Sequence, residues 1–124
     1  MLNVHWVKSH TGQWYPFETF DLFHARGNGV YVIWYDARSP AVVCVGHGNL
    51  AARLADRRTD RGIQMYRRLG MLNATWTEVP FRLQQGVASY LTEKLQPPFG
   101  DMLMLVPPIM VELPSFTRKL EHTC

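Results

Sequence analysis

Residues 53–68 carry a concentration of arginines that suits the binding of phosphate groups. The arginines of this segment are Arg53, Arg57, Arg58, Arg61, Arg67 and Arg68, and only Asp56 and Asp60 offset them. A guanidinium stays charged at any working pH, and its planar fork matches two phosphate oxygens. Arg53 and Arg57 stand four positions apart, so on a helix they would form one stripe. The segment is a candidate contact for nucleic acid, although a basic helix face that meets only solvent has the same pattern.

Histidine and cysteine give weaker indications of chemistry. His47 stands between two glycines, where it would either line a site or serve as an ordinary loop residue. Cys44 belongs to an apolar run, so we expect an inert buried thiol and not a reactive thiolate. Cys124 is the only other cysteine, so the chain has neither the ligand spacing of a zinc site nor the pattern of a disulfide-stabilised fold.

Length and composition indicate one globular domain spanning residues 1–124. The chain has 124 residues, of which 47 % are hydrophobic and 19 % charged. We expect no membrane partner, because no segment approaches the roughly 20 apolar residues of a membrane-spanning helix. The N-terminal residues lack the apolar core of a signal peptide, which favours a cytoplasmic location. The net charge of +3 is compatible with a nucleic-acid partner but does not require one.

Hydrophobic patterning predicts the elements that would position these side chains. Residues 29–35 and 41–46 are rich in β-branched and aromatic residues, so they predict a β-hairpin around the turn at 36–40. An amphipathic helix is predicted over 50–58, with Asn49 as its N-cap.

Two further main elements follow before the C-terminal tail. Residues 73–79 predict a third strand, and residues 81–95 predict a second main helix that ends before two prolines. Residues 62–72 fit either a short helix or a loop, and 109–113 fit a short edge strand. With residues 1–27 as an N-terminal arm, the order predicts an α+β fold: a small antiparallel three-stranded sheet flanked by helices.

Several short motifs in this order resemble the GIY-YIG nuclease superfamily. Gly29-Val30-Tyr31 and Cys44-Val45-Gly46 resemble the paired signature of that family, on the two strands of the predicted hairpin. Arg53, the pair Thr75-Trp76 and the helical segment 86–97 also fall where the family has its motifs. The resemblance covers about residues 27–114. It implies a GIY-YIG-like domain that hydrolyses DNA phosphodiesters with one divalent metal, Mg²⁺ or Mn²⁺.

The resemblance also implies a role for individual residues. Tyr31 would activate the attacking water, which requires cations near enough to favour its phenolate, because a tyrosine has a solution pKa of about 10. Arg53 would contact the scissile phosphate. Arg57 stands where the family has a histidine or tyrosine, so it could bind phosphate but could not act as a base. The other candidate substrate-binding residues are His47, Gly46, Cys44 and Arg58.

Position 88 departs from the family in the residue that matters most for catalysis. The family has its metal-binding glutamate there, and Ala88 has no ligand atom. Mg²⁺ prefers carboxylate and water oxygens, so we expect little metal binding and slow or no cleavage by this chain. Ala88 would be either an engineered substitution in a nuclease or a natural feature of a nucleic-acid-binding module that does not cut. A small protein-interaction domain, without nucleic acid, is the third hypothesis.

Overall fold

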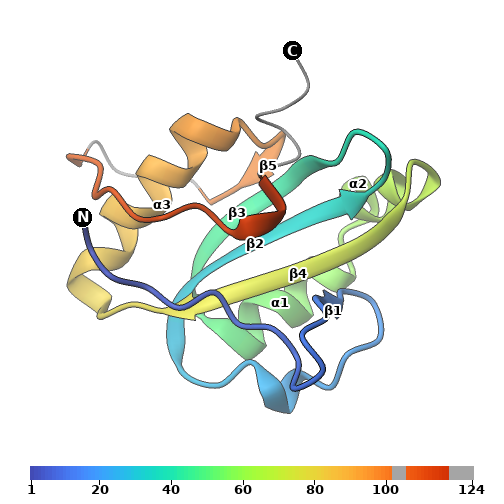
Figure 1. Ribbon diagram of the computed structural model, residues 1–124, viewed down its shortest axis with the longest axis horizontal. Coiled ribbons are helices and arrows are strands. Elements are labelled where there is room, and N and C mark those ends of the chain that lie inside the picture. Colours follow the sequence, from blue (N-terminus) through green and yellow to red (C-terminus); the bar gives the residue numbers. More distant parts are fainter. Residues whose placement is uncertain (102–105, 118–124) are drawn as a thin grey trace.

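The computed structural model describes residues 1–101 and 106–117 (Figure 1). The strands are β1 (Tyr15–Pro16), β2 (Asn28–Asp36), β3 (Ala41–Asn49), β4 (Met71–Glu78) and β5 (Phe99–Gly100). The α-helices are α1 (Leu50–Arg58), α2 (Arg61–Gln64) and α3 (Phe81–Leu95). The 3-10 helices are η1 (Leu22–His24), η2 (Met65–Arg68) and η3 (Ser115–Thr117).

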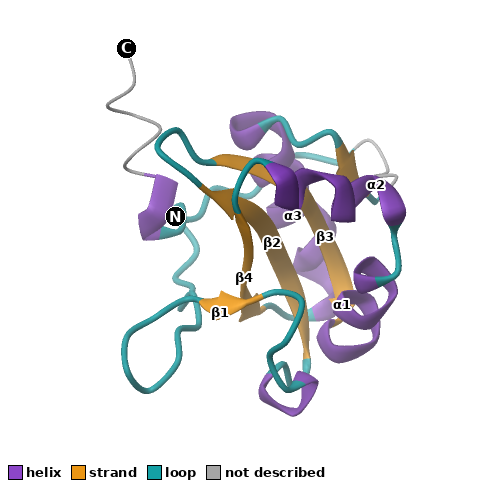
Figure 2. Cartoon of the chain, turned by 90° about the vertical axis from the view of Figure 1, so that its right-hand side faces the viewer, coloured by secondary structure: helices purple, strands orange, loops and turns teal. Residues whose placement is uncertain are grey.

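The strands form one sheet in the order β1-β4-β2-β3-β5. Figure 2 shows β4, β2 and β3 side by side, with β1 beside β4. The β1–β4, β4–β2 and β2–β3 pairs are antiparallel, whereas β3–β5 is parallel. The α+β class is therefore confirmed, but the prediction of a three-stranded antiparallel sheet is wrong, because the sheet has five strands and is mixed.

The two edge strands, β1 and β5, could not be predicted from the sequence for a physical reason. β1 and β5 contain two residues each, too few for any alternation to show, and both exist through pairing with a longer neighbour. The edge strand predicted at 109–113 is also wrong: Val111 makes only an isolated bridge with Leu2. Residues 102–105 of the predicted tail lie outside the described part of the chain.

The longer elements agree with the sequence patterns. Helices α1 and α3 begin and end where they were predicted, and the undecided segment 62–72 contains parts of α2, η2 and β4. The Asn49 side chain caps α1 by accepting a hydrogen bond from the Ala52 backbone N–H. No helix within residues 1–101 and 106–117 combines the length and apolar character needed to cross a lipid bilayer.

Side chains of β2 alternate between the two faces of the sheet. Tyr31 packs in a buried cluster that contains Leu54 of α1, which we call the α1-side cluster. Val30 and Val32 pack in a second cluster that contains Leu91 of α3, the α3-side cluster. Because neighbouring residues of a strand point to opposite faces, the sheet lies between the two helices.

Candidate functional site

Tyr31 of β2 lies on the α1 side of the sheet, opposite a glycine that makes room for it. The side chain is fully buried, and its hydroxyl accepts a hydrogen bond from Nε of Arg57 at 2.9 Å. Gly46 of β3 is the register partner of Tyr31. A Cβ at position 46 would overlap the tyrosine ring and hydroxyl, so the ring needs glycine at that position. The two signature segments therefore meet as one packing unit.

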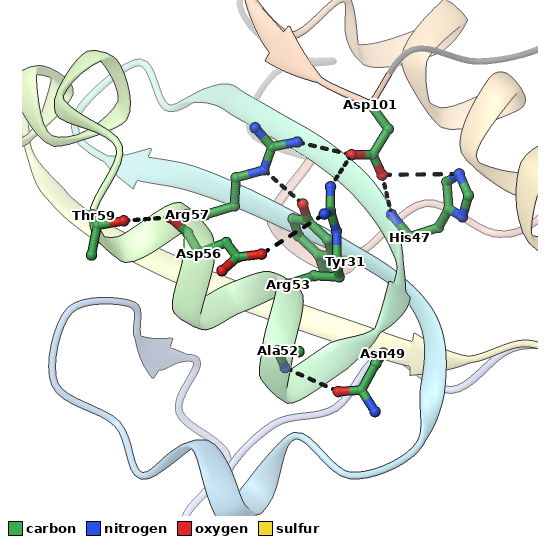
Figure 3. A network of polar contacts seen from close by, with 9 residues as sticks. All are labelled: Tyr31, His47, Asn49, Ala52, Arg53, Asp56, Arg57, Thr59 and Asp101. Atoms are coloured by element: carbon green, nitrogen blue, oxygen red, sulfur yellow. Dashed lines mark hydrogen bonds and ion pairs between the residues drawn. The ribbon is translucent and has the colours of Figure 1, made fainter.

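Two arginines of α1 converge on a single carboxylate (Figure 3). Arg53 and Arg57 stand one helical turn apart, and each donates through Nη2 to Oδ1 of Asp101, at 2.5 Å and 2.9 Å. Asp101 follows β5 directly, so the parallel pairing of β5 with β3 carries it to this place. Its other oxygen, Oδ2, accepts the backbone N–H of His47 at 2.8 Å. Three donors from two elements thus surround one oxyanion.

The cluster has more positive charge and more donors than Asp101 uses. Two guanidinium groups face one half-buried carboxylate. Asp56 lies 3.8 Å from Arg53, but it is exposed and contributes little to the balance. Nε of Arg53 is buried and has no hydrogen-bond partner among the described residues. A buried donor without an acceptor is costly. The excess of positive charge over Asp101 suits the site to an additional anionic acceptor.

The electrostatics keep Asp101 charged and Tyr31 neutral. Burial opposes ionisation of Asp101, but the His47 amide and the two arginines outweigh it and lower the pKa of the carboxyl. Burial is the largest influence on Tyr31 and raises its pKa, and the nearby Cys44 adds to the rise; the Arg57 contact only partly offsets these effects. The phenolate that water activation would require is therefore disfavoured, although Arg57 does reach the hydroxyl.

Two predicted binding residues lie near this cluster but have other surroundings. Cys44 is a buried free thiol in the α1-side cluster, and burial raises its pKa to about 11, as expected for an inert thiol. Arg58 points away from Asp101: its guanidinium donates to the backbone carbonyls of Phe17 and Phe20. One residue along a helix corresponds to a rotation of about 100°, which places Arg58 against the N-terminal arm instead of the site.

Ala88 lies on the other face of the sheet. It is only 1 % exposed and belongs to the α3-side cluster, whereas Tyr31 belongs to the α1-side cluster. The described residues also contain no group of three or more His, Cys, Asp or Glu that could hold a metal ion. Both oxygens of Asp101 already accept hydrogen bonds from the protein. The side chains at this site therefore fit an oxyanion better than a divalent cation.

Asp101 is the site residue that the sequence did not reveal. It lies 44 positions from Arg57 and 48 from Arg53, in a segment with no helical or strand period. The only local indication is a single acidic residue beside Gly100, just before an apolar run. Its partners become apparent only once the parallel pairing of β5 with β3 is known.

Comparison of the chain with protein-family models, with curated proteins and with solved structures gives no significant match.

Proposed function

We propose that this chain binds the phosphodiester backbone of DNA, as a non-cleaving module on a GIY-YIG-like fold. The observation that carries the proposal is the convergence of Arg53, Arg57 and the His47 amide on one oxyanion, the Asp101 carboxylate. A phosphodiester presents two non-bridging oxygens in a similar spacing, so it can accept the same hydrogen bonds. The proposal includes a cytoplasmic location, where the chain would meet its partner.

Asp101 acts in this proposal as an internal competitor for the site. The DNA phosphate replaces the carboxylate as the acceptor for the Nη2 groups of Arg53 and Arg57. Asp101 is tethered to the chain, so its effective concentration at the arginines is high. Binding is consequently weak at physiological salt and much tighter at low salt, because released counterions contribute much of the affinity.

Metal-dependent hydrolysis of DNA is the second candidate. Tyr31 and Arg53 favour it because they match the motifs expected of a nuclease, although Arg57, which contacts Tyr31, departs from them. Against it stand the buried, neutral tyrosine and the alanine at position 88. An Ala88→Glu variant that gained Mg²⁺- or Mn²⁺-dependent cleavage of labelled DNA would favour hydrolysis over simple binding.

Salt-dependent DNA binding distinguishes these candidates from a protein-interaction domain. Fluorescence anisotropy with short labelled DNA should show affinity that falls steeply between 50 and 200 mM salt, on the order of tenfold or more for several phosphate contacts. Arg53→Ala should weaken binding and make the salt slope shallower by about 1. Arg67→Ala is a matched control, because it removes the same charge from an exposed pair with Glu18. Equal losses in both variants, or no binding at low salt, would contradict the proposal.

A further inference from the structure

A pocket between α3 and the segment at 106–109 shares one residue, His47, with the arginine cluster. It has a volume of about 370 Å³, within the usual range for small-molecule sites. Its lining includes His47, Phe81, Arg82, Gln85, Pro107 and Ile109. The walls are mostly apolar, and a guanidinium, an amide and an imidazole supply polar groups around them. This combination suits a flat heteroaromatic ring with hydrogen-bonding edges.

One wall of the pocket carries an unusually exposed aromatic ring. Phe81, the first residue of α3, is 86 % exposed, the largest fraction of any exposed apolar side chain in the described residues. A core role is excluded by that exposure, and no described aromatic ring stacks on it. Proteins that bind single strands use such rings as platforms on which bases stack.

The facing wall is fixed in place by a close approach to α3. The backbone N–H of Ile109 donates to the carbonyl of Gly86 at 2.9 Å. A Cβ at Gly86 would lie 2.6 Å from the Ile109 side chain, so a larger residue there would force that side chain to move. The pocket is therefore a built feature of the fold, held open between α3 and the segment at 107–109.

His47 joins the pocket to the phosphate site. Its backbone N–H donates to Asp101, its ring nitrogen Nε2 lies 3.9 Å from the same carboxylate, and the residue also lines the pocket. A phosphate at the Asp101 position and a ring in the pocket would both contact this one residue. Gln85 could both donate to and accept from a base edge, as an amide side chain does.

We infer that this pocket receives one unstacked nucleobase of the DNA strand whose phosphate binds Arg53 and Arg57. The inference rests on the proposed function and adds which form of DNA the chain binds. The base stacks on Phe81, and Gln85 and Arg82 meet its edges. Because a base inside a duplex cannot reach such a pocket without flipping, the module prefers single-stranded or unpaired DNA to an intact duplex.

Abasic DNA tests the inference separately from backbone binding. The probes are two labelled single strands of equal length, one intact and one with tetrahydrofuran abasic residues, so their phosphates are the same. Wild-type protein should bind the abasic strand about tenfold more weakly, the order expected for one stacked base. Phe81→Ala should lose about tenfold for the intact strand and nothing for the abasic strand. Phe23→Ala, at another exposed phenylalanine, should change neither affinity.

The failures of the two proposals look different in this experiment. Equal, salt-dependent affinity of wild-type protein for both strands would overturn the base pocket and leave backbone binding intact. The same conclusion follows if Phe81→Ala keeps the preference for the intact strand. Absence of binding to either strand would remove the proposed function itself. A dimer that depends on Phe81 in sedimentation, with no effect on DNA affinity, would assign the pocket to a second copy of the chain.

Discussion

The two faces of the sheet share the same strands and each has an apolar cluster, but only the α1 side also carries the charged cluster around Asp101. On the α1 side, β2 presents Tyr31, whose hydroxyl meets Arg57, and the charged cluster around Asp101 closes over the β3 edge. On the α3 side, β2 presents Val30 and Val32 to an apolar cluster. The period of two along one strand thus separates Tyr31 from the residues of the α3-side cluster.

This difference bears on the proposal that the chain binds DNA without cutting it. The predicted residues Tyr31, Arg53, Arg57 and His47 assemble with Asp101 at one place. Ala88 is buried in the apolar cluster on the opposite side of the sheet. A metal-binding carboxylate at that position would be surrounded by hydrophobic side chains, which disfavours its charge. Phosphate binding by Arg53 and Arg57 needs only residues on the α1 side. Metal chemistry would also need a carboxylate at position 88, on the α3 side.

The largest effect is expected from a charge placed on the apolar face. Ala88→Glu should destabilise the fold by about 3 kcal/mol, because a carboxylate would be buried without a partner. Urea denaturation gives the free energy of unfolding. The neighbouring Ser89→Glu, at a partly exposed position, should cost much less. If the free energy of unfolding of Ala88→Glu equals that of the wild-type protein, the surroundings of position 88 can accommodate a charge and the α3-side cluster is not purely apolar.

A smaller but clear loss is expected from crowding on the polar face. Gly46→Ala should destabilise the protein by about 2 kcal/mol, because the added methyl overlaps the buried Tyr31 ring. If that overlap is the cause, adding Gly46→Ala to a Tyr31→Ala background should cost little. Thermal denaturation of the two single variants and the double variant measures the coupling. Additive losses would show that Gly46 is needed for some other reason.

Removing the internal competitor should strengthen DNA binding. Asp101→Asn deletes the negative charge that Arg53 and Arg57 now share, so affinity for single-stranded DNA at low salt should rise by about tenfold. Anisotropy titrations compare the variant with Asp56→Asn, which removes an exposed acid beside the same arginine. Unchanged or weaker binding by Asp101→Asn alone would show that the carboxylate does not compete with DNA.

Asp101 should also make stability depend on pH. Its folded pKa lies below the unfolded value of about 3.8, so the unfolded state binds a proton first as the pH falls. The stability that the carboxylate contributes is fully present at neutral pH and is lost as the pH falls from above 3.8 through the folded pKa. Denaturation between pH 2 and pH 7 should therefore show a smaller acid loss for Asp101→Asn than for the wild-type protein. Parallel profiles would contradict the ion-pair account.

Sequence patterns predicted the parts of this molecule that local chemistry determines. The helices at 50–58 and 81–95 and the long hairpin follow from periodicity and caps, and Arg53 and Arg57 share a stripe because they stand one turn apart. The resemblance assigned the segments 29–31 and 44–46 to the two strands of the hairpin, and the register of those strands then pairs Tyr31 with Gly46.

What escaped prediction depends on contacts between distant segments. Asp101 reaches the arginines only through the two-residue pairing of β5 with β3, which leaves no periodic trace in the sequence. Arg58 looked equivalent to its neighbours, but the N-terminal arm supplies carbonyl acceptors that draw it away. The burial of Tyr31 is likewise set by packing around it, so the sequence could not decide whether its pKa would fall or rise.

The most direct test of the central claim follows the backbone amide of His47 by NMR during titration with short single-stranded DNA. This amide donates to Asp101, so replacement of the carboxylate by a phosphate must change its environment. We expect saturable shifts of the His47 amide and of the Arg53 and Arg57 Nε–H groups, reversed by added salt, with the Arg67 Nε–H unaffected. DNA binding that leaves the His47 amide unshifted would place the nucleic acid elsewhere and contradict the account.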